Sequence, residues 1–238
     1  MKIGAIITAR SNSARYPRKH LGILGGKPMI VQIIDKLNQL ENLDQVILST
    51  TTNPEDDDLC DIAHNSGADL NRGSEHNLLE RDLQAIDTFK LDAVLVVSGD
   101  WPFISNAGSQ LLIDGYRATD NPEQYTTVNG SESLSEMTGF LGHICTKKYY
   151  EIFKKLIKKY EHKYSYEQYW QADVEEPELF KILNIDTSSI MDPTITPMNM
   201  TIDWNLQRLF FNKIIDYLGF YPETIADFNR AYGGIREL

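Results

Sequence analysis

The chain has 238 residues, of which 42 % are hydrophobic and 24 % are charged, as is usual for one folded α/β domain. Its 34 acidic side chains outnumber 23 basic ones, which gives a formal net charge of −11 at pH 7. This surplus argues against a nucleic-acid or anionic-membrane partner, because most of the surface would repel phosphates. Cys60 and Cys145 have no metal-ligand spacing, and the N-terminal apolar run is too short for a signal peptide, so a cytoplasmic protein is expected.

Apolar runs typical of strands alternate with helical patterns over the first half of the chain. Strands are predicted at 2–8, 45–49, 68–71 and 92–97, and helices at 28–40, 55–64, 77–89 and 105–119. This alternation predicts right-handed βαβ units and a mainly parallel sheet with helices on both faces. In such sheets the ligand binds at the carboxyl ends of the strands.

The pattern changes after residue 124. Strands are predicted at 126–130, 137–145 and 179–185, and helices at 147–160 and 165–172. We interpret residues 124–190 as a small α+β arm inserted in a single domain that spans 1–238, with a role in dimerisation or acceptor binding. A late strand at 200–202 and a closing helix at 205–218 complete the prediction.

A basic loop follows the first predicted strand. The segment Ala9–Lys19 reads ARSNSARYPRK and places Arg10, Arg15, Arg18 and Lys19 among small polar residues. Guanidinium forks and closely approaching backbone N–H groups are what a triphosphate requires. A solvated surface loop is the alternative for such a cluster, but its position after the first strand of an α/β sheet favours phosphate binding.

Two aspartates follow apolar runs and precede predicted helices. Asp100 lies in SGDWP directly after the strand at 92–97, and Asp203 lies in MTIDW. Either aspartate taken alone could be a helix N-cap. Two carboxylates facing one basic loop are better explained by a Mg²⁺ site, because Mg²⁺ takes one or two protein carboxylates and completes its shell with phosphates and water.

Four segments resemble one family in the same order. The opening AIITARSNSARYPRKHLGILGGKPMI resembles the start of the cytidylyltransferases that activate 3-deoxy-manno-octulosonate and acylneuraminates, and most of all their spore-coat polysaccharide (SpsF-type) branch. The segments NRGSEHNLLER, SGDWPFI and TIDWNLQRL resemble later motifs of that family. Similarity between about residues 120 and 180 is only loose.

The resemblance implies a Rossmann-like, three-layer nucleotidyltransferase fold of the GT-A-like kind, CTP as donor, Mg²⁺ as cofactor and a homodimer. Arg10, Lys19 and Asp100 would be catalytic, and Asp100 and Asp203 would bind the metal. The residues that would bind the nucleotide are Ala9, Arg10, Ser11, Ser13, Arg15, Lys19, Arg72, Gly73 and Ser74. Trp101 departs from the small or polar residue usual in the family, so the acceptor pocket beside it is expected to differ.

The function predicted from these residues is transfer of CMP from CTP to a small acidic sugar of the nonulosonate or octulosonate type, with release of pyrophosphate, for surface polysaccharide synthesis. Trp101 and His143 are candidate acceptor residues, although a structural role is the favoured explanation of His143. His20 is expected at an ordinary surface or loop position. The alternatives are a phosphate or phosphonate acceptor, or a glycosyltransferase of the same broad fold that uses a nucleotide sugar.

Overall fold

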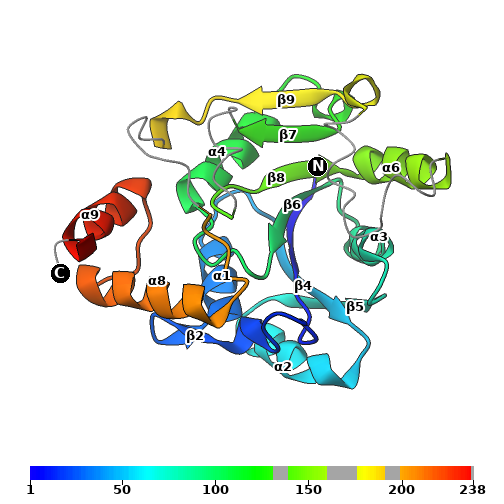
Figure 1. Ribbon diagram of the computed structural model, residues 1–238. Coiled ribbons are helices and arrows are strands. Elements are labelled where there is room, and N and C mark those ends of the chain that lie inside the picture. Colours follow the sequence, from blue (N-terminus) through cyan, green and yellow to red (C-terminus); the bar gives the residue numbers. More distant parts are fainter. Residues whose placement is uncertain (131–138, 160–175, 191–198, 237–238) are drawn as a thin grey trace.

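The computed structural model describes residues 1–130, 139–159, 176–190 and 199–236, with side chains described up to Ala231 (Figure 1). Its centre is a seven-stranded sheet in the order β5-β4-β1-β6-β8-β7-β9. The strands are β1 (Ile3–Thr8), β4 (Gln45–Thr51), β5 (Asp69–Gly73), β6 (Ala93–Ser98), β7 (Thr127–Gly130), β8 (His143–Thr146) and β9 (Ile182–Ile185), and β2 (Ile23–Leu24) pairs separately with β3 (Lys27–Pro28).

Helices connect and flank these strands. The α-helices are α1 (Met29–Leu37), α2 (Asp57–Asn65), α3 (Leu78–Phe89), α4 (Asn106–Arg117), α6 (Lys147–Lys159), α8 (Asn205–Leu218) and α9 (Ile225–Arg236). Short 3-10 helices are η1 (Lys19–Leu21), η2 (Pro54–Asp56), η3 (Pro122–Gln124), η5 (Pro177–Leu179) and η6 (Ser188–Ile190). No helix in the described part of the chain is both long and apolar enough to cross a membrane.

The sheet is mostly parallel. The neighbours β5–β4, β4–β1, β1–β6 and β7–β9 run parallel, whereas β8 is antiparallel to both β6 and β7. The predicted arm at 124–190 therefore contributes β7, β8 and β9 to the main sheet. The predicted helix at 165–172 lies outside the described residues, and whether an arm projects there stays a prediction.

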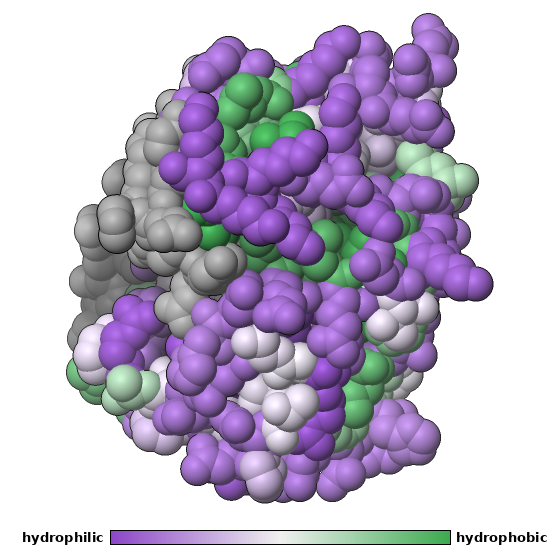
Figure 2. Space-filling view, turned by 90° about the vertical axis from the view of Figure 1, so that its right-hand side faces the viewer, coloured by the Kyte–Doolittle hydropathy of each residue, from purple (hydrophilic) through white to green (hydrophobic). Residues whose placement is uncertain are grey.

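The sheet is the middle of three layers, and helices bury both of its apolar faces. One face packs on α1, α2 and α4, and the opposite face packs on α3 and α6. A third cluster joins α8 and α9 to Phe103 and Phe140, whose rings are almost fully buried. Figure 2 shows that hydrophilic side chains dominate the surface on the α3 and α6 side. The architecture is the expected Rossmann-like α/β fold.

Two strand predictions need correction. Residues 200–202 form no strand: Ile202 N–H donates to the Asp100 carbonyl at 3.0 Å, while the side chains of Met200 and Ile202 are buried under α8 and α9. Their apolar pattern therefore reflects burial against helices rather than strand pairing. The strand predicted at 137–145 is shortened to β8, because the chain turns at Gly139, whose φ is +84°, and Phe140.

Candidate active site

The candidate site lies where the chain reverses its direction of travel across the sheet. From β1 the chain proceeds outward through β4 and β5, and it then returns to place β6 on the other side of β1. The loops after β1 and β6 therefore diverge from neighbouring strand ends, which is where open α/β sheets bind ligands. Gly99 N–H donates to the Thr8 carbonyl at 2.8 Å and joins the two loops at their base.

Four of the side chains predicted for the site meet at this end of the strands: those of Arg15, Lys19, Asp100 and Asp203. Lys19 Nζ lies 2.5 Å from Asp100 Oδ2 and 3.3 Å from Asp203 Oδ1, and Arg15 Nη2 lies 2.6 Å from the same oxygen of Asp203. The Lys19 side chain is only 9 % exposed, and those of Asp100 and Asp203 are 16 % and 21 % exposed. Residues far apart in sequence thus form one charge cluster, in which Lys19, Asp100 and Asp203 are largely buried and Arg15 is 55 % exposed.

The hydrogen bonds exclude the simpler explanation of both aspartates as helix caps. Ser105 caps α4 by accepting from the Gly108 amide at 3.0 Å. At the start of α8 the Gln207 side chain accepts from the amides of Asp203 and Trp204 at 2.8 and 2.9 Å. Both carboxylates are therefore free of capping roles and face Lys19.

Electrostatics favour the ionised form of Asp100. Burial alone would raise the pKa of its carboxyl group, but the charge of Lys19 and the hydrogen bond from Lys19 outweigh burial and hold the pKa below its ordinary value. Asp100 is consequently a carboxylate at neutral pH and is available to a cation.

The loop from Gly99 to Ile104 is fixed through its carbonyl groups. His20 Nδ1 bonds to the Gly99 carbonyl at 2.8 Å, and the Asp100 carbonyl accepts from Ile202 as described above. Tyr221 Oη donates to the Pro102 carbonyl at 3.0 Å, and the buried Lys36 Nζ donates to the Ile104 carbonyl at 3.1 Å. Four different parts of the chain therefore hold the loop that carries Asp100.

The first half of the basic loop faces the other side of the site. Ala9 N–H donates to the Ser49 carbonyl at 3.2 Å, and Ser11 N–H donates to Asp56 Oδ1 at 2.6 Å. Arg10 Nη1 reaches the Glu75 carbonyl at 3.3 Å, in the loop after β5. The loop thus extends from the segment after β5 to the charge cluster.

The other predicted nucleotide-binding residues serve local contacts. The Arg72 guanidinium donates to the carbonyls of Thr51 and Asn53 at 2.8 and 2.7 Å and pairs with Asp57. Ser74 Oγ accepts from the Asn77 amide at 3.1 Å, and Ser13 Oγ accepts from the Tyr16 amide at 3.4 Å. Gly73 is closely packed, because a Cβ added there would lie 2.6 Å from the side chain of Gln84.

The candidate acceptor residues have apolar surroundings. Trp101 is half-buried against the core between the sheet, α1 and α4. His143 begins β8, pairs with Val96 and is also half-buried. Desolvation lowers the pKa of His143 to about 4, so its ring is neutral at pH 7. Neither residue takes part in the charge cluster.

The position of His20 differs from the expectation of an ordinary surface or loop residue. Its exposed fraction is 3 %, and both ring nitrogens are engaged: Nδ1 with the Gly99 carbonyl and Nε2 with the Arg10 amide at 3.4 Å. Burial lowers the pKa of His20, so the neutral ring is favoured. Asp56 was missed as well, as it lies in an acidic run that resembles a solvated helix start. No local sequence signal distinguishes either residue.

The donor set fits a magnesium ion. Two carboxylates that contact one ammonium nitrogen lie close enough to share a small cation, and Mg²⁺ needs no more protein oxygens than these. Within the described ranges no group of three or more Asp, Glu, His or Cys side chains is placed to hold a metal ion. Any metal at this site would therefore take most of its ligands from water or phosphate.

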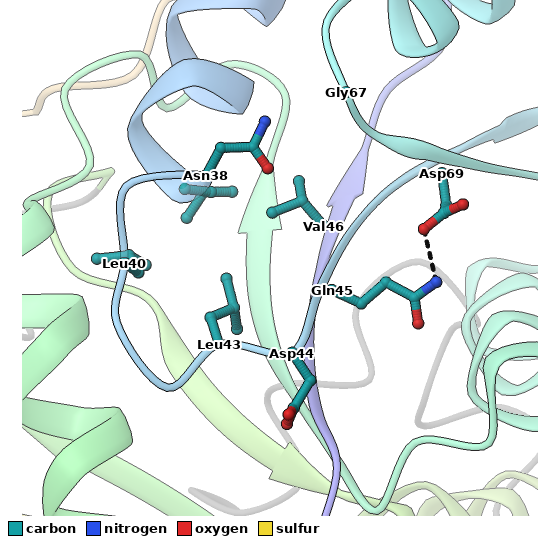
Figure 3. Close-up of a pocket in the computed structure, with 9 residues that line it drawn as sticks. Asn38, Leu40, Leu43, Asp44, Gln45, Val46, Gly67 and Asp69 are labelled. Carbon is teal, nitrogen blue, oxygen red and sulfur yellow. Dashed lines mark hydrogen bonds between the residues drawn. The ribbon is translucent and has the colours of Figure 1, made fainter.

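A separate hollow lies at the opposite end of the strands, near the start of β4 (Figure 3). It has a volume of about 220 Å³ and lies between the end of α1 and the start of β4, with Asn38, Leu43 and Gln45 in its lining. The candidate site adjoins the other end of β4, beyond Thr51. The hollow is therefore not part of that site.

Comparison with known proteins agrees with this architecture. An uncharacterized protein of Methanocaldococcus jannaschii, MJ1063, is 27 % identical over 94 % of this chain and 93 % of that protein. The spore coat polysaccharide biosynthesis protein SpsF of Bacillus subtilis is 27 % identical over 52 % of each chain. The 3-deoxy-manno-octulosonate cytidylyltransferase 2 of Hydrogenovibrio crunogenus is 26 % identical over 50 % of this chain and 49 % of that enzyme. The alignments thus reach only about half of these two relatives.

Solved structures show the same fold. A cytidylyltransferase from Leptospira borgpetersenii superposes with a TM-score of 0.80 at 22 % identity, over 100 % of this chain and 94 % of that one. A CMP:2-keto-3-deoxy-manno-octonic acid synthetase, solved in complex with CTP, gives 0.64 at 15 % identity, over 91 % and 99 %. The family model for cytidylyltransferases matches residues 4–155. The chain therefore belongs to the cytidylyltransferase family of nucleotidyltransferases.

Proposed function

We propose that this protein transfers CMP from CTP to a small acidic sugar of the nonulosonate or octulosonate type and releases pyrophosphate, as a step in surface polysaccharide synthesis. The observation that carries the proposal is the cluster of Lys19 with Asp100 and Asp203 beside the basic loop. Named relatives that act on 3-deoxy-manno-octulosonate, or in spore coat polysaccharide synthesis, support the acceptor class and the pathway.

The basic loop orients the donor in this proposal. The cytosine and ribose would lie towards Ala9, Gly73 and Ser74, and the triphosphate would extend from Arg10 towards Arg15 and Lys19. This placement follows the run of the loop from the Glu75 carbonyl to Asp203. Arg72, whose donors are bound to the loop after β4, would support the nucleoside end indirectly through that loop.

The reaction needs no protein nucleophile. An acceptor oxygen attacks the α-phosphorus in line, a new P–O bond forms, and the bond to the β-phosphate oxygen breaks so that pyrophosphate leaves. Lys19 and Arg10 offset charge that develops on the phosphates. Asp100 and Asp203 would hold Mg²⁺, which supplies further charge neutralisation when bound. The acceptor's proton is released to water.

The acceptor pocket would adjoin Asp100. Trp101 follows it directly and offers a flat apolar surface, whereas His143 is neutral at pH 7 and would serve as a hydrogen-bond partner only. The carboxylate of an acidic acceptor would therefore draw on a cation such as Arg15, whose side chain is 55 % exposed. We further propose a homodimer, which light scattering after size-exclusion chromatography tests.

Pyrophosphate release tests the whole proposal. The wild-type protein is assayed with Mg²⁺, with CTP, UTP, ATP or GTP, and with a panel of acidic sugars and phosphorylated or phosphonylated acids. We expect pyrophosphate release to require CTP and one acidic sugar. The substitution Asp100→Asn should abolish it. Asp35→Asn is the matched control, because Asp35 pairs with Lys27 at an exposed site away from the cluster.

The pattern of activity separates the alternatives. Release with CTP and only a phosphorylated or phosphonylated acid would replace the acidic-sugar acceptor by that class. Failure of CTP to raise the melting temperature, together with cleavage of a nucleotide sugar, would overturn the proposal in favour of a glycosyltransferase.

A further inference from the structure

His20 is the one buried histidine of the described chain with both ring nitrogens engaged by two different loops of the candidate site. The Gly99 carbonyl can only accept a hydrogen bond, so Nδ1 of His20 carries the proton. Nε2 is then the acceptor for the Arg10 amide. The neutral ring with this tautomer satisfies both contacts, and no other protonation state does.

The loop after β6 approaches the His20 ring closely at Gly99. A Cβ added at Gly99 would lie 3.0 Å from His20 Nδ1 and 2.9 Å from the Cβ of Ala9, so only glycine lets the loop after β6 approach this closely. The imidazole therefore lies between the two loops, and its hydrogen bonds fix the position of one loop relative to the other.

The position of this contact links it to the charge cluster. His20 follows Lys19 in the chain, and Gly99 precedes Asp100. The His20–Gly99 hydrogen bond at 2.8 Å and the Lys19–Asp100 ion pair at 2.5 Å are thus adjacent cross-links between the same two segments. A shift of either contact would move the other, because Lys19 and His20 are consecutive residues and so are Gly99 and Asp100.

We propose that His20 is a positioning residue for the transfer reaction. Through Nδ1 it sets the distance between Lys19 and Asp100, and through Nε2 it fixes the amide and the direction of Arg10. The inference rests on the function proposed above. It also assigns separate effects to the two nitrogens: the Nδ1 contact governs the reacting end of the site, and the Nε2 contact governs the nucleotide end.

Three substitutions separate these contacts. In His20→Asn the side-chain amide can donate to the Gly99 carbonyl in place of Nδ1, and in His20→Gln the longer amide can accept from Arg10 in place of Nε2. His20→Phe keeps an aromatic ring but makes neither hydrogen bond. His64→Asn, on the exposed surface of α2, is the matched control.

Steady-state kinetics give the expected pattern. We expect His20→Phe to lower kcat by about 100-fold and to raise the KM for CTP, since a misplacement of about 1 Å costs rate on that scale. His20→Asn should recover most of the lost kcat but keep a raised KM, and His20→Gln should show the reverse. Equal values for all three variants and the wild type, or equal losses without any division between kcat and KM, would overturn the proposal.

Hydrogen–deuterium exchange tests the same inference without activity. His20→Phe should increase deuterium uptake in residues 9–20 and 98–102 together, and His20→Asn should restore protection of 98–102 more than that of 9–20. An increase spread over the whole chain would indicate general destabilisation and contradict a positioning role. If the wild type uses no CTP but the exchange pattern holds, the proposed function fails while the coupling by His20 stands.

Discussion

Replacement of Lys19 by Met removes the ammonium group that Asp100 and Asp203 share and keeps an apolar stem of similar length. In the wild type the nitrogen lies 2.5 Å from one carboxylate and 3.3 Å from the other. After the substitution Asp203 still has Arg15 as a partner. Asp100, whose side chain is 16 % exposed, loses its only ion pair among the described residues.

The magnitude follows from burial and charge. At an effective dielectric constant of about 20, a unit pair at 2.5 Å gains about 6–7 kcal/mol before desolvation. Removal of one partner of a buried pair costs about 3–5 kcal/mol in net stability. Because water reaches the carboxylates in part and Arg15 remains, we expect the lower end, about 3 kcal/mol, which corresponds to a fall in Tm of about 6–12 °C for a chain of this size.

A divalent cation should reverse part of this loss. We expect Mg²⁺ or Mn²⁺ to raise the Tm of Lys19→Met more than that of the wild type, because in the wild type a metal competes with the ammonium group for the same carboxylates. Differential scanning calorimetry without and with the metal measures both effects. Lys27→Met is the matched control, since the Lys27–Asp35 pair is exposed and should cost less than about 1 kcal/mol. Equal stability of Lys19→Met and wild type without metal, or equal gains with metal, would refute this reasoning.

Three further predictions concern the supports of the site. Gly99→Ala should cost about 1–3 kcal/mol and most of the activity, because the new Cβ would lie 3.0 Å from the Thr8 carbonyl; thermal unfolding and pyrophosphate release measure both. Tyr221→Phe removes the donor to the Pro102 carbonyl and should lower the free energy of unfolding by about 1 kcal/mol, by denaturant titration. The lowered pKa of His143 means that the unfolded state binds more protons between pH 6.5 and about 4, so stability falls as the pH drops through that window. His143→Phe should flatten this part of the curve by about 1–2 kcal/mol, allowing for relief by water at a half-buried ring; an unchanged slope would contradict it.

The central fold could be predicted because each of its elements carries a local signal. The apolar runs that became β1, β4 and β6 and the amphipathic pattern of α8 depend on neighbouring residues alone. The parallel arrangement then follows from alternation, and the site follows from the loops at the strand ends. The meeting of Lys19 with Asp100 was foreseeable in the same way.

Other features depend on contacts that no short segment encodes. Residues 200–202 read as a strand because burial under helices and burial in a sheet select the same apolar side chains. His20 and Asp56 are polar residues whose burial is decided by partners distant in sequence, Gly99 and Ser11. The pairing of β8 with β6 likewise places a late segment antiparallel to an early one, a choice that periodicity does not record.

The attachment of the Gly99–Ile104 loop has a consequence for the newly made protein. Two of its four donors, Ile202 and Tyr221, and the second carboxylate, Asp203, are translated long after Asp100. At about 5–20 residues per second, the ribosome needs on the order of 5–20 s to advance from Asp100 to Asp203. Throughout that interval the nascent chain already has β1, β4 and β6 but only one of the two carboxylates. In the proposed mechanism, which uses both carboxylates, competence for nucleotide transfer is therefore acquired late in synthesis, after the C-terminal segment that carries Asp203 has been made.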